Sequence, residues 1–323
     1  MTSSPKDRQG GVALVTVMIV VAAAVVLGVQ MTTEQTLAVS RAGNFIRSQQ
    51  AMEYAIGGEE LARQILAEDQ RISPGKDHLA EVWASPDLQY EFEEGTIRLQ
   101  ITDLSGRLNI NSLRAGDGLA RTRFENLARE LGVDPVFVHR LADWVDEDDA
   151  KSNLGAEDFD YLGLERPYRT AGRPIPDVSE LRLLLEMDNA TFEAIEPYIT
   201  AIPDPDTIIN VNTAPARVIK AIAPELSLEM AEGLAAQRDQ QEGYNDIESF
   251  IEDPVLANAG ISEAGLGVQS GFFEVNVVAS YEDRFAYLTS IIQRDQDGGM
   301  RVIYRDISKK ISPAIDDTRE YDD

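Results

Sequence analysis

Carboxylate side chains are concentrated between Asp143 and Asp160, where they offer ligands for a cation. The segment holds eight acidic residues against one basic residue, Lys151. Carboxylates this dense repel one another unless water or a hard cation separates them, and calcium accepts about six to eight oxygen ligands in flexible geometry. The residue types alone leave open a solvated acidic loop and a calcium-binding loop. The eight residues are Asp143, Asp146, Glu147, Asp148, Asp149, Glu157, Asp158 and Asp160.

An EF-hand does not explain this segment. Asp146, Asp148 and Glu157 have the spacing of positions 1, 3 and 12 of an EF-hand loop. Position 5 is then Ala150, and Lys151 stands at position 6, where the sharp turn of an EF-hand needs glycine. Any calcium site here must therefore use a loop of a different shape.

Other chemistry has little support in the composition. The chain has no cysteine, which excludes disulfides and thiolate chemistry, and its two histidines, His78 and His139, are not close to a recognisable nucleophile. It contains no phosphate-binding or dinucleotide-binding glycine pattern. We therefore do not expect an enzyme. The formal charge of -27 disfavours nucleic acid and anionic membrane surfaces as partners.

An apolar segment near the N-terminus predicts a membrane anchor. Residues 12–29 contain only one polar side chain, Thr16, and approach the length that spans a bilayer. Lys6 and Arg8 precede the segment, which predicts a cytoplasmic N-terminus and places the rest of the chain outside the cytoplasm. A cleaved secretory signal peptide is the alternative. We favour the anchor because helix-forming residues continue to about Asp69.

The continuing helix carries an amphipathic apolar stripe that is continuous with the membrane segment. The stripe consists of Phe45, Met52, Ala55, Ala62 and Leu66, which recur at helical spacing. Gly57 and Gly58 are weak points within this helix.

Strands are expected on both sides of a helical region. Alternating residues between Tyr90 and Thr102 predict a hairpin that turns at Glu94 and Gly95. Three further strands are predicted between Phe273 and Tyr304, whereas residues 119–265 have a helical pattern. We therefore expect an α+β fold, in which a long N-terminal helix and an antiparallel sheet carry a large inserted all-helical domain.

The predicted organisation has six parts. They are residues 1–11, a leader; 12–30, the transmembrane half of the helix; 31–114, the first part of the sheet domain; 115–265, the acidic helical domain; 266–310, the closing strands; and 311–323, an acidic disordered tail.

The N-terminus resembles a type IV prepilin leader. Gly11 is followed by the run Val-Ala-Leu-Val-Thr-Val-Met-Ile-Val-Val, which begins at Val12. The resemblance implies that prepilin peptidase cuts after Gly11 and that Val12 becomes a methylated N-terminus. Most pilins have glutamate at the fifth mature position, where this chain has Thr16. In pilins that carboxylate is thought to pair with the N-terminal amine of the preceding subunit, so Thr16 suggests a subunit with nothing ahead of it.

The body of the chain is similar to general secretion pathway protein K, the largest minor pseudopilin of type II secretion. Nearly the whole chain takes part in the resemblance. One departure is Gly172, where family members usually have asparagine. The motifs, in order, are Asp103–Asn111 (DLSGRLNIN), Asp143–Asp148 (DWVDED), Gly155–Asp158 (GAED), Pro167–Arg169 (PYR), Ser179–Leu183 (SELRL) and Ile209–Pro215 (INVNTAP).

The resemblance implies a location and partners. It predicts a single-pass inner-membrane protein with a periplasmic body, which caps the pseudopilus and starts its assembly. Expected partners are minor pseudopilins I and J, with H as a further candidate, and prepilin peptidase. It also favours calcium in the helical domain. We expect the ligands to be Asp146, Asp148, Glu157 and Asp158, with Asp143 turned back toward its own helix.

Two alternative functions stay open. Residues 210–240 resemble a helix-hairpin-helix DNA-binding module, with Asn212 or Thr213 as helix N-cap ahead of Pro215. Nine acidic residues against three bases in residues 208–253, and a connection without glycine at 224–227, disfavour a grip on phosphates. The other alternative is a minor pilin of a related type IV pilus.

Overall fold

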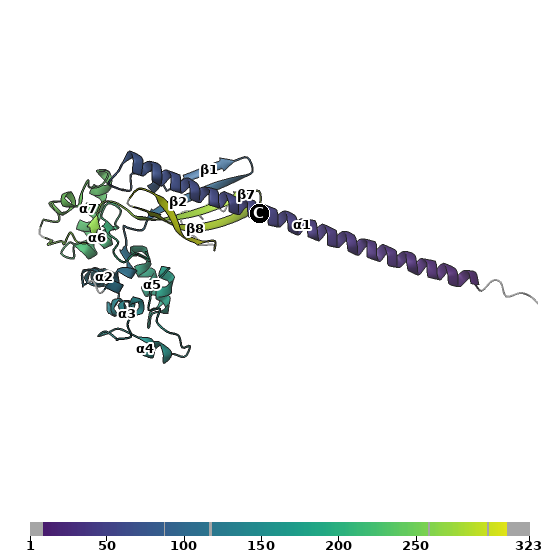
Figure 1. The fold of residues 1–323 in the computed structure, drawn as a ribbon, viewed down its shortest axis with the longest axis horizontal. Helices are drawn as coiled ribbons and strands as arrows, with labels where there is room; N and C mark the ends of the chain where they lie inside the picture. Colours follow the sequence, from purple (N-terminus) through teal and green to yellow (C-terminus); the bar gives the residue numbers. More distant parts are fainter. Residues whose placement is uncertain (1–8, 87, 116–117, 258, 296, 309–323) are drawn as a thin grey trace, which may run out of the picture.

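Helix α1, Gln9–Ile72, extends far beyond the rest of the molecule (Figure 1). The computed structural model describes residues 9–308 except 87, 116, 117, 258 and 296. At about 1.5 Å per residue, the 64 residues of α1 span roughly 96 Å. The stretch Ala13–Ile72 contains a window with mean hydropathy 2.6, which is long and apolar enough to cross a membrane. The helix continues without a break into the folded body, so it fits a single-pass anchor.

Five antiparallel strands form the main sheet in the order β1-β2-β7-β8-β9. The structure confirms the predicted hairpin and the three predicted closing strands. Alternating side chains of β2 and β7 are buried on one face of the sheet, which explains the pattern in the sequence. Strands β2 and β7 are neighbours although residues 104–271 lie between them in sequence. The strands are β1 Leu88–Phe92, β2 Gly95–Asp103, β7 Phe272–Tyr281, β8 Arg284–Arg294 and β9 Met300–Asp306.

The C-terminal part of α1 packs on this sheet through small side chains. Ala51, Ala55, Ala62 and Leu66 are fully buried, and a Cβ on Gly58 would lie 2.7 Å from a methyl group of Val277. The predicted stripe is therefore present from residue 52 onward. Its first member, Phe45, is 65% exposed and lies outside the contact with the sheet.

A helical body fills the sequence between β2 and β7. Two short parallel pairs, β3 with β4 and β5 with β6, brace it and were not predicted. Its helices are α2 Gly118–Glu130, α3 Val136–Val145, α4 Asp158–Leu162, α5 Asn189–Ile195, α6 Ala216–Ile222, α7 Leu228–Gln240 and α8 Ile247–Ile251. The short strands are β3 Leu108–Asn109, β4 Ile199–Thr200, β5 Ile209–Asn210 and β6 Leu266–Gly267. Short 3-10 helices cover Val82–Ala84, Ile110–Ala115, Val178–Leu183 and Glu196–Tyr198.

Separate hydrophobic cores underlie the sheet and the helical body. Trp83 and Phe273 belong to the core between α1 and the sheet, whereas Trp144 and Tyr161 belong to the core of the helical body. The expected α+β class with a pilin-like helix and an inserted helical region is confirmed. The exact residue boundaries of the six parts stay predictions. Residues 1–8 of the predicted leader and the predicted tail, 311–323, lie outside the described residues.

Candidate functional site

Helices α3 and α4 bring the acidic segment together. The buried side chain of Trp144, in the last turn of α3, packs edge-on against Tyr161 of α4, with ring centroids 5.0 Å apart. This contact brings the end of α3 close to the start of α4, and the intervening residues 146–157 must loop between them. Carboxylates at both ends of the loop therefore meet.

Three carboxylates, which we call the loop cluster, face one another at this place. Asp143, Asp146 and Glu157 each offer an oxygen, and these atoms all lie within 4.8 Å of one another. Asp143 and Glu157 are buried, and Asp146 is half-buried. Ordinary ligand distances of about 2.3 to 2.6 Å would let one calcium ion contact all three.

Several polar atoms of the loop cluster have no hydrogen-bond partner among the described residues. They are Oδ1 of Asp146, both carboxylate oxygens of Glu157, and the neighbouring hydroxyl of Ser152. Buried oxygens without a partner are costly, and several converging oxygens are the ligands that a hard cation prefers. The residues present therefore fit calcium.

Burial and mutual repulsion raise the pKa of two of these groups. Desolvation raises the pKa of Glu157 to about 7, helped by the charges of Asp143 and Asp146. Desolvation also raises the pKa of Asp146 to about 6, helped by Asp148 and Asp143. An ion that binds in the cluster would compete with these protons.

The loop backbone is shaped to admit these side chains. A Cβ on Gly155 would lie 1.8 Å from Oδ2 of Asp143, so any larger residue must displace that carboxylate. The preceding Leu154 has φ of 69°, a left-handed conformation that is strained for a branched residue. Such strain is retained where surrounding contacts hold the backbone in place. Here these contacts include the hydrogen bond from the Ser152 N–H to Oδ2 of Asp143 at 3.1 Å.

Two of the four ligands expected from the sequence lie in the loop cluster, and the other two lie outside it. Asp146 and Glu157 lie in the loop cluster, whereas Asp148 is exposed and accepts from the N–H of Ala150 at 2.8 Å. Asp158 accepts from Thr170 and from Arg169, and these partners hold its pKa below the usual range. Asp143 was expected to face its own helix, and this was wrong, because it faces the loop.

The departure at Gly172 has a local explanation. Gly172 has φ of +54°, and its N–H donates to the carbonyl of Trp144 at 3.1 Å. Glycine and asparagine are the residues that adopt this left-handed conformation most readily, so either serves at this turn.

The basic side chains of the helix-hairpin-helix-like segment have internal partners. Arg217 and Lys220 pair with Glu130, and Arg238 is buried and donates to the carbonyls of Val211 and Ala214. Phosphate recognition needs basic groups that can reach a ligand. These contacts therefore favour a structural helix pair.

The predicted N-cap of this segment is wrong. Helix α6 begins at Ala216, after Pro215, and Pro215 makes no side-chain capping bond. The amide of Asn212 instead bonds the backbone of Tyr244, and the hydroxyl of Thr213 donates to Asp103. These side chains join distant segments, which local capping patterns do not reveal.

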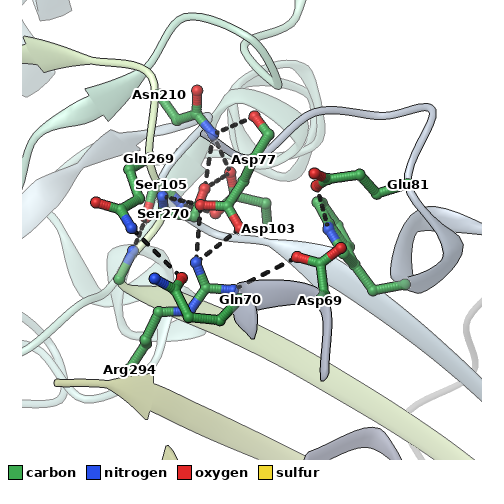
Figure 2. A network of polar contacts seen from close by, with 12 residues as sticks. Asp69, Gln70, Asp77, Glu81, Asp103, Ser105, Asn210, Gln269, Ser270 and Arg294 are labelled. Carbon is green, nitrogen blue, oxygen red and sulfur yellow. Dashed lines mark hydrogen bonds and ion pairs between the residues drawn. The ribbon is translucent and has the colours of Figure 1, made fainter. Parts of the chain in front are cut away.

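A buried polar junction joins the sheet and the helical body (Figure 2). Asn210 donates to the carbonyl of Asp77 at 3.1 Å and to the hydroxyl of Ser270 at 2.7 Å. Ser270 donates through its backbone N–H to Asp77 and through its hydroxyl to Asp103. The motifs at 103–111 and 209–215 meet here, but no sequence pattern indicated that Asp77 and Arg294 complete the junction.

Comparison with known proteins agrees with this architecture. Residues 106–204 and 209–269 match the family description "Type II secretion system (T2SS), protein K". The chain is 35% identical over 322 residues to type II secretion system protein K of Pseudomonas aeruginosa, covering 93% of each chain. It is 33% identical to the Klebsiella pneumoniae protein of the same name, over 80% of this chain and 83% of that one.

A solved structure has the same fold. It is described as the GspK-GspI-GspJ complex from the type 2 secretion system of enterotoxigenic Escherichia coli. The matching chain has a TM-score of 0.75 and 24% identity, and the match covers 84% of this chain and all of that one. The architecture and these relatives agree, and the chain belongs to the type II secretion system protein K family, as a minor pseudopilin.

Proposed function

We propose that this protein caps the pseudopilus and starts its assembly. The observation that carries the proposal is the position of the helical body, which lies at the end of the molecule farthest from the apolar part of α1 (Figure 1). A body of this size would obstruct another subunit that stacked above it, whereas it can be accommodated at an end. Thr16 supports the same place, because an uncharged residue there has no need of a preceding subunit's amine.

Locating the protein on purified pseudopili tests the tip position. Antibodies against the helical body, viewed by electron microscopy, should label one end of each filament. Labelling at regular intervals along the filament would contradict the proposal.

Processing at Gly11 and Val12 accompanies this function. Prepilin peptidase would remove residues 1–11, and the mature α1 would then leave the inner membrane to join pseudopilins I and J through its exposed apolar part, with the body in the periplasm. The E. coli structure with the same fold is of a complex with those two proteins, which supports this choice of partners. Mass spectrometry should find Val12 as a methylated N-terminus. A mature chain that retains Met1, or that begins beyond Val29, would contradict the proposed processing.

The loop cluster is proposed to bind calcium through Asp143, Asp146 and Glu157. An ion that binds only the folded chain stabilises it by mass action, and the chain has no disulfide to do so. The unpartnered oxygens of Asp146 and Glu157 support a specific site. Asp148 and Asp158, which the sequence also suggested, already have other hydrogen-bond partners.

Matched variants of the full chain in detergent distinguish the two ligand sets. Titration calorimetry should show one calcium-binding component that is lost in Asp146→Asn with Glu157→Gln. Asp148→Asn and Asp158→Asn should retain it if the loop cluster alone forms the site. Loss of that component in these two controls would favour the expected ligand set that includes Asp148 and Asp158, and its absence from every form would return the segment to a solvated loop.

A further inference from the structure

A second group of carboxylates lies where α1 ends, far in sequence from the loop cluster. Asp69 is in the last turn of α1, and the following loop returns to bring Asp77 and Glu81 beside it. Each residue offers an oxygen, and these atoms all lie within 4.8 Å of one another. We call these three residues the junction cluster (Figure 2).

Two of the facing oxygens have no hydrogen-bond partner among the described residues. Oε2 of Glu81 accepts from the indole Nε1 of Trp83 at 2.7 Å and from the N–H of His78 at 3.0 Å. Oε1 of Glu81 and Oδ2 of Asp69 have none. The Glu81 side chain is only 7% exposed, so water does not satisfy it freely. Two residues of the cluster thus each keep a buried carboxylate oxygen without a hydrogen-bond partner among the described residues.

Arg294 neutralises only part of this charge. Arg294 donates from Nη1 to both oxygens of Asp77, at 2.7 and 2.8 Å, whereas its Nη2 is 3.9 Å from Oδ2 of Asp69. In Figure 2 the Asp69 carboxylate lies between Arg294 and Glu81, so the guanidinium is on the other side of Asp69. When all three carboxylates are ionised, as ion binding requires, one guanidinium leaves two negative charges.

Neighbouring groups do not remove this excess. Nε2 of His78 is 3.6 Å from Oε1 of Glu81, but burial lowers the pKa of His78 and keeps the imidazole neutral near pH 7. Asp103 adds a further buried carboxylate behind Asp77. Asp103 already accepts hydrogen bonds from the hydroxyls of Ser270 and Thr213. Burial, with the charges of Glu81 and Asp77, raises the pKa of Asp69 to about 7.

A cavity gives access to the cluster from outside. It has a volume of about 470 Å³ and is lined by Asp69, His78 and Glu81 together with apolar side chains that include Ile72 and Val82. Ile72 and Val82 are 69% and 70% exposed, so this wall of the cavity is at the surface. An ion could therefore enter with water molecules that complete its coordination.

We propose that the junction cluster binds a divalent cation of the calcium class through Asp69, Asp77 and Glu81. The two positive charges of such an ion balance the two negative charges that Arg294 does not neutralise. Carboxylate and water oxygens are also the ligands that hard cations prefer. The site is separate from the loop cluster and belongs to the sheet side of the molecule. Its binding would fasten the end of α1 to the loop that leads into β1.

The two tryptophans of the chain allow each site to be observed. Trp83 bonds to Glu81 of the junction cluster, whereas Trp144 is adjacent to Asp143 of the loop cluster. Terbium binds oxygen sites in place of calcium and emits when a nearby tryptophan is excited. The experiment uses the full chain in detergent, with Asp146→Asn and Glu157→Gln to remove the loop cluster.

In that background, tryptophan excitation should give terbium emission that excess calcium displaces. Adding Glu81→Gln or Asp69→Asn should abolish the emission. Glu68→Gln is the matched control, because Glu68 lines the same cavity, is exposed and pairs with Arg71, and it should leave the emission unchanged. Circular dichroism checks that each variant keeps its helical content.

Two results would overturn the proposal. One is terbium emission that persists in the folded Glu81→Gln and Asp69→Asn variants. The other is an absence of emission in the background that lacks the loop cluster, in which case a shared proton between Asp69 and Glu81 accounts for their facing oxygens. Neither result bears on calcium at the loop cluster, whose variants are measured separately.

Discussion

Gly155 sets the shape of the loop cluster at the scale of single residues. The space that its missing Cβ leaves is filled by the carboxylate of Asp143, which is held there by the N–H of Ser152. The importance of Gly155 therefore comes from a neighbour 12 residues earlier in the chain. Its own backbone conformation is not left-handed.

Gly155→Ala should weaken calcium binding at the loop cluster. The added methyl group must push Asp143 away from Asp146 and Glu157, and a loss of roughly tenfold or more is expected, as when groups that orient metal ligands are altered. Calorimetry of the full chain measures this effect. Gly163→Ala is the control, because its nearest contact is an ordinary 3.5 Å, and equal weakening in both variants would contradict the role given to Gly155.

Calcium binding at the loop cluster should weaken as the pH falls from 7 to 5. The raised pKa values, about 7 for Glu157 and about 6 for Asp146, mean that protons compete with the ion in this range. In ion-free protein the stability should change with pH in the opposite direction. The folded state holds protons on Glu157 and Asp146 that the unfolded state releases, so the free energy of unfolding falls as the pH rises from about 4 to 7. Melting temperatures across this range with calcium and with a chelator should therefore have opposite slopes. Parallel slopes would contradict this account.

The residues of the loop cluster were only partly predictable from sequence. The density of acidic residues indicated the loop, and two of the four expected calcium ligands, Asp146 and Glu157, lie in the loop cluster. Asp143 was placed wrongly because helix geometry alone does not show that the loop folds back over the end of α3. The junction cluster had no sequence signal at all, since Asp69, Asp77 and Glu81 come from a helix end and an irregular loop.

At the scale of elements, the packing of α1 on the sheet depends on its small residues. Gly58 is buried against Val277 and Ile97, where a Cβ would lie 2.7 and 2.9 Å from their methyl groups. The adjacent Gly57 is exposed and has no atom closer than 4.0 Å to the position of a Cβ. Two neighbouring glycines that look equivalent in sequence thus have opposite roles.

Gly58→Ala should destabilise the protein, whereas Gly57→Ala should stabilise it. Forcing a methyl group against β2 and β7 costs about 1–3 kcal/mol of unfolding free energy. At Gly57 the substitution only raises helix propensity, worth about 0.5–1 kcal/mol. Thermal unfolding of both variants measures the difference, and a stable Gly58→Ala variant would show that the helix can lift from the sheet without penalty.

The elements of the sheet were more predictable than those that join it to the helical body. Alternation between Tyr90 and Thr102, and between Phe273 and Tyr304, indicated the strands because one face of the sheet is buried against α1. The two-residue strands β3 to β6 are too short to show a period. They depend on pairing between distant segments.

At the scale of the whole molecule, Asn210 holds the two hydrophobic cores together. Its amide donates to Asp77, Asp103 and Ser270, and its Oδ1 accepts from the N–H of Asn212 at 2.9 Å. The residue is fully buried. Polar contacts, whose directions are more specific than those of apolar packing, thus act beside the apolar cluster of Leu104, Ile202, Phe272 and Ile291 in positioning the sheet and the helical body.

Asn210→Ala should make the two bodies unfold separately. Leaving the buried partners of Asn210 unsatisfied costs about 1–3 kcal/mol, and most of that loss falls on contacts between the bodies. Calorimetry should then resolve two transitions. Asn126→Ala is the control, because Asn126 bonds Ala221 within the helical body at 3.0 Å, and a single transition in both variants would contradict the coupling.

The continuity of α1 has a mechanical consequence. The helix runs without interruption from its apolar end to Asp69, which lies beside Arg294 and the polar junction. An axial load applied at the apolar end therefore has no flexible linker in which to dissipate. The load is transmitted along the helix to the contacts between the sheet and the helical body, so α1 couples force at its membrane end to the polar junction.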